Sequence, residues 1–170
     1  MERGNPLAQD ALQKCLKAGE GEFLCKIVEH LHMGVKVMRD LKREEQFLAD
    51  NTLDSHRDVT VYLSALHQSR EQKIASLSSV LRLIQLFCEG HHLGLQEWGN
   101  EQPSSGNSVN MVGEILKFLH EVLLTGVSQS TAALAIQLFA TLTEFCQGPC
   151  PRSQSTLMEM SPNACHEVNV

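Results

Sequence analysis

Apolar residues recur at spacings of three and four through most of the chain, whereas strict apolar-polar alternation is almost absent. The first pattern places apolar side chains on one face of an α-helix, and the second would be needed for a half-buried strand. The clearest stripe consists of Ile74, Leu77, Val80, Leu81, Ile84 and Phe87. Gly90 follows at a position suited to a left-handed C-terminal cap. The chain is therefore predicted to be all-α.

Similar stripes predict further helices at 7–17, 23–48, 112–123 and from Ser128 or Ser130 to about 147. The stretch 59–67 fits either a short helix or a strand-like segment, and its residues do not decide between them. Polar loops are expected at 51–58 and 100–110, and a frayed tail beyond Pro151. Helices joined by short loops predict stacked helical hairpins, as in an armadillo-like solenoid segment, or a compact helical bundle.

Composition excludes several classes of function. The chain has 14 Lys and Arg against 20 Asp and Glu, and only 5% aromatic residues, so a nucleic-acid partner is not expected. No run of 18 apolar residues could span a membrane, and the N-terminus lacks the apolar region of a signal peptide. Cytoplasmic localisation is therefore expected, with the cysteines kept as thiols. Phosphate-loop, nucleophile-elbow and His-Glu-x-x-His motifs are absent, so an enzyme is not predicted.

Two glutamates lie at unusual places. Glu89 follows directly on a long predicted helix, and Glu144 lies in the last turn of another. A helix C-terminus carries unpaired carbonyls and partial negative charge, so an anion is disfavoured there by about 0.3 to 1 kcal/mol. Gln147 lies three residues after Glu144 and is expected on the same helix face. If the two ends meet, their oxygens would suit a hard cation; otherwise both glutamates simply face water.

A second set of residues would suit a softer metal. Cys88, His91 or His92, Cys146 and Cys150 combine a Cys-x-x-His spacing with a Cys-x-x-x-Cys spacing. Thiolate and imidazole ligands in such a set fit tetrahedral Zn²⁺. Buried cysteines that only fill the core are the alternative explanation, because Cys88 ends an apolar helix and Cys146 follows an aromatic residue.

Two segments together resemble one known family. The first is Leu-Ile-Gln-Leu-Phe-Cys-Glu-Gly-His-His at 83–92, and the second is Leu-Thr-Glu-Phe-Cys-Gln-Gly-Pro-Cys at 142–150. They resemble the RIH-associated domain shared by inositol trisphosphate receptors and ryanodine receptors, the intracellular calcium release channels. The first segment is nearer the ryanodine receptor form and the second nearer the inositol trisphosphate receptor form, so the subfamily stays open. The resemblance covers about residues 76–157.

The resemblance implies a site as well as a fold. In that family a cytosolic helical-repeat module lies above the pore and relays ligand binding to the gate. The glutamates of its Cys-Glu-x-His and Thr-Glu-aromatic-x-Gln motifs coordinate the activating calcium, and here they correspond to Glu89 and Glu144. The neighbouring residues that support this site correspond to His91 and Gln147.

Some features depart from the family pattern. A further calcium ligand comes from a domain beyond the pore, which this chain does not contain, so a Ca²⁺ site here would be incomplete and weak. The family usually continues after Gln96 with Asn, an aromatic residue, Leu and Arg, but here 97–100 read Glu-Trp-Gly-Asn. The segment 103–137 also looks shortened.

These observations together predict a calcium-linked regulatory segment that does not itself form a pore. Its expected partners are other domains or subunits of a calcium release channel, on the cytosolic face of the endoplasmic or sarcoplasmic reticulum. A helical interaction scaffold without ion sensing and a zinc-stapled helical domain are the alternatives. Three parts are expected: a helical segment at 1–75, an RIH-associated-like domain at 76–157 and a disordered tail at 158–170.

Overall fold

A computed structural model describes residues 4–19, 22–50, 57–103, 105–126, 128–148 and 150–159. Within these residues the fold is all-α, as predicted, and has no strand. The helices are α1 (Pro6–Ala18), α2 (Glu22–Asp50), α3 (Arg57–Cys88), α4 (Leu93–Asn100), α5 (Met111–Thr125), α6 (Gln129–Cys146) and α7 (Pro151–Glu159). None of these helices combines the length and the apolar character needed to cross a membrane.

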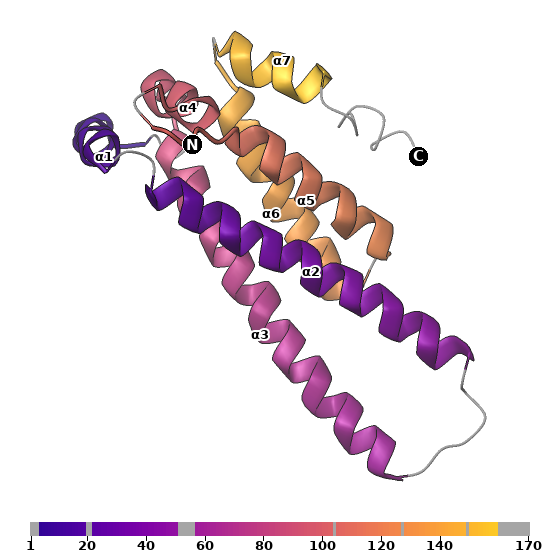
Figure 1. Ribbon diagram of the computed structural model, residues 1–170. Coiled ribbons are helices and arrows are strands. Elements are labelled where there is room, and N and C mark those ends of the chain that lie inside the picture. The colour runs from indigo at the N-terminus through magenta and orange to yellow at the C-terminus, as the bar shows by residue number, and fades with distance from the viewer. Residues whose placement is uncertain are drawn as a thin grey trace.

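Two helical hairpins stacked on each other form the body of the molecule (Figure 1). The antiparallel helices α2 and α3 make one layer, and α5 and α6 make the other, so that α2 packs on α5 and α3 packs on α6. The short helices α1, α4 and α7 gather at one end of this stack (Figure 1). The prediction of stacked hairpins or a bundle is thus confirmed.

Local sequence signals set the helix ends. Asn5, Asn110 and Ser128 are N-caps whose side chains accept a hydrogen bond from the backbone N–H three residues on. Ser128 also forms a capping box with Thr131, which resolves the choice between two possible caps for the last long helix. Gly126 ends α5 with a φ of 97°, a left-handed conformation that favours glycine.

The structure differs from the sequence-based helix assignment in three places. The segment 59–67 is helical and continues without a break into the helix predicted at 74–87, forming α3. Helix α4 was not predicted, and the expected frayed tail beyond Pro151 begins instead as α7. Residues 160–170 of the predicted disordered tail lie outside the described residues, and the proposed boundary between 75 and 76 falls inside α3.

The core runs the length of the two hairpins. Its members with almost no exposure include Leu24, Leu31, Met38, Leu81, Ile84, Met111, Ile115, Phe118, Leu119, Leu134 and Leu138. Helix α5 is buried on more than one side, because α2 covers one face of it and α6 another. At the crossing of α2 and α5, Gly34 lets the Phe118 ring approach the α2 backbone.

Gly34→Ala is expected to lower the free energy of unfolding by about 1–3 kcal/mol. A Cβ at this position would lie 2.6 Å from Cζ of Phe118 and 3.0 Å from Cδ2 of Leu77, both in the core. The clash outweighs the gain of about 1 kcal/mol that alanine normally brings to a helix interior. Urea unfolding measures the change. Gly106→Ala is the control, because a Cβ there meets nothing within 4 Å; a stabilised Gly34→Ala protein would contradict the close packing.

Ion pairs along the edge of the α2–α5 contact make the stability of this contact depend on pH. Glu114 accepts hydrogen bonds from His32 at 2.8 Å and from Lys117 at 2.7 Å. Burial raises the pKa of Glu114, but the contacts with Lys117 and His32 outweigh it and hold the pKa below its usual value. The hydrogen bond from Arg39 likewise lowers the pKa of Glu121.

Acid should therefore weaken the contact between α2 and α5. A carboxylate whose pKa is lower in the folded chain stabilises the fold fully above its unfolded pKa of about 4.5, and this contribution disappears as pH falls through the folded value. Glu114→Gln is expected to cost about 1–2 kcal/mol at pH 7 and to flatten the loss of stability below pH 4.5. Glu71→Gln, at an exposed site on α3, is the control in the same urea series. Equal pH profiles for both variants would refute the assignment.

Candidate functional site

The first part of the candidate site is the turn that ends α3. Glu89 is the first residue after the helix, and its side chain is half-buried. Gly90 and His91 follow with φ of 75° and 67°, and the His91 N–H donates to the Cys88 carbonyl at 3.0 Å. Gly90 is therefore in the left-handed conformation that its position predicted. A positive φ is uncommon for His91, which marks this turn as one that its surroundings hold in place.

A glutamine from α1 satisfies the carbonyls of this helix end. The Nε2 group of Gln9 donates to the carbonyls of Phe87 at 3.0 Å and Glu89 at 2.8 Å, with a longer contact of 3.4 Å to Leu86. The last carbonyls of any helix lack partners within the helix. Gln9 is 7% exposed, so water has little access to this cap.

A second glutamine does the same for α6. Gln96, a fully buried residue of α4, donates through Nε2 to the carbonyls of Glu144 at 2.7 Å and Gln147 at 2.8 Å. Helix α6 ends at Cys146, and Gln147 is its C-cap with an extended backbone and an exposed side chain. Gln147 lies outside the helix, so the three-residue spacing does not place its side chain on the same face as Glu144. Its backbone carbonyl accepts a hydrogen bond from Gln96.

The two helix ends lie against each other. A Cβ built on Gly148 would lie 3.0 Å from Cβ of His91, so the turn after α6 touches the turn after α3. Gly148 has a φ of 75°, which favours glycine at this contact. Cys88, at the end of α3, is fully buried close enough to Glu144 for the carboxylate charge to act on its thiol.

One carboxylate oxygen of Glu144 has no hydrogen-bond partner among the described residues. This atom, Oε2, is buried. Oε1 of Gln96 is in the same situation. Buried polar atoms are nearly always paired, with protein, water or an ion. Calcium takes carboxylate and amide or carbonyl oxygens as ligands, so the carboxylate of Glu144 fits that cation in kind. Glu89 belongs to the turn after α3, which touches the turn after α6.

The thiols of the alternative zinc set lie near enough for their charges to act on one another. Burial, followed by the effect of Cys150, Glu144 and Cys146, raises the pKa of the Cys88 thiol far above its usual value. Burial and Cys150 raise the pKa of Cys146 to about 11. Zinc binds thiolates, and this surrounding favours the neutral thiol. Among the described residues, no three His, Cys, Asp or Glu side chains are grouped so that they could hold a metal ion.

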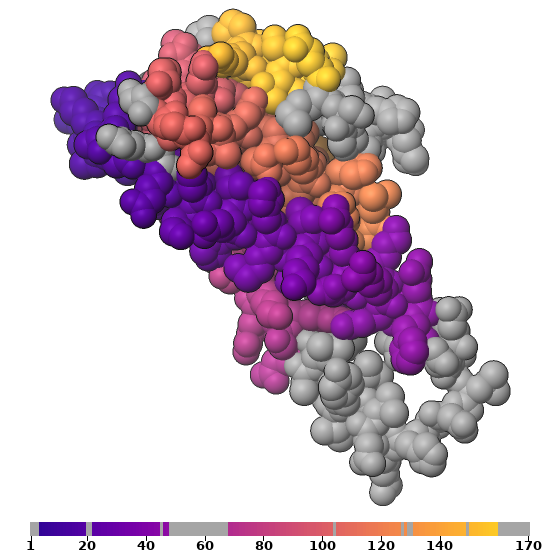
Figure 2. Space-filling model, viewed as in Figure 1, coloured from indigo at the N-terminus to yellow at the C-terminus, as the bar shows by residue number. Residues whose placement is uncertain are grey.

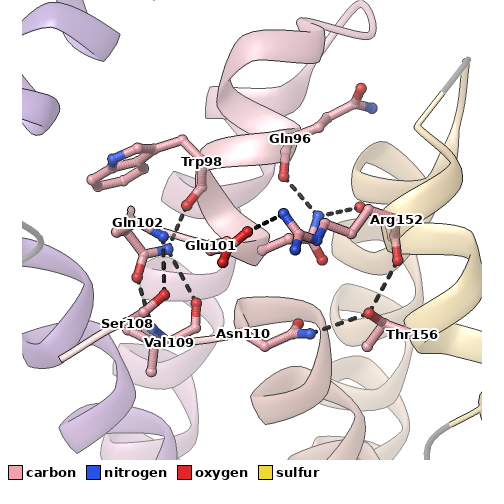
Figure 3. A network of polar contacts seen from close by, with 11 residues as sticks. Gln96, Trp98, Glu101, Gln102, Ser108, Val109, Asn110, Arg152 and Thr156 are labelled. Carbon is pink, nitrogen blue, oxygen red and sulfur yellow. Dashed lines mark hydrogen bonds and ion pairs between the residues drawn. The ribbon is translucent and has the colours of Figure 1, made fainter. Parts of the chain in front are cut away.

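Helix α4, which carries Gln96, is fixed by a polar network (Figure 3). Gln102 donates to the carbonyls of Trp98 and Val109 and accepts from the Val109 N–H at 2.7 Å, which closes the loop between α4 and α5. Asn100 donates to Ser153 of α7 at 2.6 Å. Arg152 of α7 also pairs with Glu101 (Figure 3). The network therefore holds α4 in place between α7 and the start of α5.

The structure thus brings together the ends of the two helices that bear Glu89 and Glu144. His91 lies in the contact between them, whereas His92 is the N-cap of α4, where Nδ1 accepts from the Leu95 N–H at 3.2 Å. The two capping glutamines were not predicted. Gln96 did carry a signal, since it lies beside Leu95 and Trp98 in a segment with an apolar face.

Comparison with known proteins identifies the class of this helical module. Residues 71–169, more than half of the chain, match the family described as RyR and IP3R Homology associated. The chain therefore belongs to that family, as the resemblance indicated. It is also 36% identical over 105 residues to "Inositol 1,4,5-trisphosphate receptor itr-1" of Caenorhabditis elegans. That match covers 56% of this chain but only 4% of the receptor. No solved structure matches the chain significantly.

Gln96→Met is expected to lower the free energy of unfolding by about 1–3 kcal/mol per carbonyl left without a donor. Methionine keeps the length of the side chain but cannot donate to Glu144 or Gln147. Urea unfolding gives the magnitude, and amide exchange should show faster opening at 144–148. Gln154→Met is the control, because that exposed side chain donates at the outer edge of the same helix end. A larger effect at Gln154 than at Gln96 would contradict the assigned cap.

Proposed function

We propose that the chain is a calcium-linked regulatory segment of an intracellular calcium release channel, and not an enzyme. In this proposal Glu89 and Glu144 hold Ca²⁺, with His91 and Gln147 supporting the two turns. Membership of the RyR and IP3R Homology associated family and the similarity to a named inositol trisphosphate receptor support the channel context. Its partners would be other parts of such a channel, at the cytosolic face of the endoplasmic or sarcoplasmic reticulum.

The observation that carries the proposal is the meeting of two helix ends, one of which bears a buried carboxylate oxygen without a partner among the described residues. The contact between His91 and Gly148 brings the turns together, and Oε2 of Glu144 is buried without a partner among the described residues. Two helix C-termini concentrate negative potential at one place, and their carboxylates add to it. A bound divalent cation would neutralise this charge.

Repulsion between the carboxylates of Glu89 and Glu144 would make the conformation of the site depend on calcium. Two carboxylates near one another repel, so the arrangement in which Glu89 approaches Glu144 is costly until a cation is present. Calcium would then favour the closed arrangement of the two turns by its differential affinity for it. The shift would reach the rest of the molecule through α3 and α6, which pack on each other.

The first test is a calcium titration of the whole chain to millimolar concentration in zinc-free buffer. Amide resonances of 89–91 and 144–147 are expected to shift along one binding curve with a dissociation constant of about 10⁻⁴ to 10⁻³ M, as for a site with few charged ligands. The double variant Glu89→Gln/Glu144→Gln should abolish these shifts while circular dichroism shows unchanged helix content. Glu71→Gln/Glu97→Gln removes the same charge from exposed positions and should still bind.

Other outcomes separate the alternatives. Unchanged calcium binding by the Glu89→Gln/Glu144→Gln protein would disprove the site. A folded wild-type chain that shows no shift at either turn would be a helical interaction scaffold. Zinc bound one-to-one in the purified protein, with loss of structure on chelation, would identify the zinc-stapled alternative at Cys88, His91, Cys146 and Cys150.

A further inference from the structure

Helix α1 contacts α4 and the turn that carries Glu89. It lies at one end of the stacked hairpins, beside α4 (Figures 1 and 2). Gln9 donates to Phe87 and Glu89, and Asp10 pairs with Nε2 of His92 at 3.1 Å. Helix α1 therefore holds both sides of the turn, before and after the two residues with positive φ.

The backbone fits closely around the same point. A Cβ on Gly4 would lie 2.2 Å from the Glu89 carbonyl oxygen and 2.8 Å from Nε2 of Gln9. A Cβ on Gly94, just beyond the turn, would lie 2.5 Å from the side-chain amide of Gln13. Glycine is needed at Gly4, where the contact is with the backbone, whereas at Gly94 the flexible Gln13 side chain could shift. These contacts enclose the Glu89 carbonyl between the start of α1 and its Gln9 side chain.

The hydrogen bonds of His92 indicate which ring nitrogen carries the proton. Nδ1 accepts from the Leu95 N–H, so a neutral ring carries its proton on Nε2 and can donate it to Asp10. His92 thus links α1 to the first turn of α4. Because Gln96 of α4 caps α6, the polar contacts run from α1 through α4 to the turn that follows Glu144.

Apolar contacts alone hold α1 weakly. Leu16 is buried and Leu12 packs partly against the core, whereas Leu7 is 82% exposed. An isolated helix of 13 residues is marginal in water, so α1 depends on its docking contacts to stay formed. Gln9 is the buried polar residue at the centre of these contacts. Loss of its hydrogen bonds should therefore release the turn before it disturbs the hairpins.

We propose that α1 is a clasp on the Glu89 turn and that Gln9 is a positioning residue, which sets the affinity of the calcium site by holding the Glu89 backbone. This inference rests on the proposed function, and extends it to residues outside the matched segment 71–169. Gln9 acts by keeping the turn in its left-handed conformation, so that calcium does not have to order it. The apparent affinity of a site falls in proportion to the fraction of molecules in the competent conformation.

The test uses the full chain with Gln9→Met, which keeps the side-chain length but removes the donor. In the absence of calcium, amide exchange at His91, whose N–H bonds the Cys88 carbonyl, is expected to be about tenfold faster. Calcium affinity, read from the amide shifts at Glu89 and Glu144, is expected to fall by a similar factor of about ten. Gln13→Met, one turn further along α1, is the control and should change either value less than about twofold.

A reciprocal effect distinguishes positioning from a general loss of stability. If α1 favours the calcium-bound turn, calcium must favour docked α1 by the same factor. Calcium should therefore slow amide exchange within α1 of the wild-type chain, and slow it less in Gln9→Met. Thermal unfolding of both variants reports on the hairpins, which are expected to keep their stability.

The outcomes separate this inference from the proposed function. Calcium binding that is unaffected by Gln9→Met overturns the positioning role, whether or not exchange at His91 changes. If wild-type protein binds no calcium, the proposed function fails and so does the link to affinity. In that case, exchange at His91 alone decides whether α1 is a clasp: faster exchange in Gln9→Met supports it, and unchanged exchange refutes it.

Discussion

Helix C-termini buried against other helices leave carbonyl groups that water cannot reach, and the described part of this fold depends on how those carbonyls are satisfied. Helices α3 and α6 end side by side, each with a glutamate in or just after its last turn. Gln9 caps one end and Gln96 the other. A neutral amide donates to the carbonyls without adding a charge. Lysine or arginine would cap as well, but would add a cation beside the two helix ends.

This arrangement explains why the short helices exist. Helix α4 presents Gln96 to the end of α6, and α7 supports α4 through Ser153 and Arg152. Helix α1 presents Gln9 to the end of α3. None of these three helices is long enough to be stable alone, so each is held by polar contacts with its neighbours. The long helices supply the core, and the short ones complete the hydrogen bonding at one end of it.

Periodicity predicted the long helices because their apolar stripes are buried between two layers. It missed α4, which has only eight residues and contains Gly94 and Gly99, and α7, whose single buried residue is Ser153. Both helices depend on contacts with distant residues, and each is too short for more than a weak apolar spacing. Glu89 and Glu144 could be assigned to the two helix ends because an acidic residue at a helix C-terminus is unusual in itself. Gln9 could not, because its partners lie about 80 residues away.

The extent of the family match does not coincide with the extent of the core. The match begins at residue 71, within α3, yet α5 is buried on more than one side, and one of those sides is covered by α2. A helix with apolar residues around most of its surface is stable only when it is covered on several faces. Leu31 and Met38 of α2 supply that cover. The segment before residue 71 therefore supplies α2, one of the four long helices of the two-layer core, and α1 extends this same segment to the Glu89 turn.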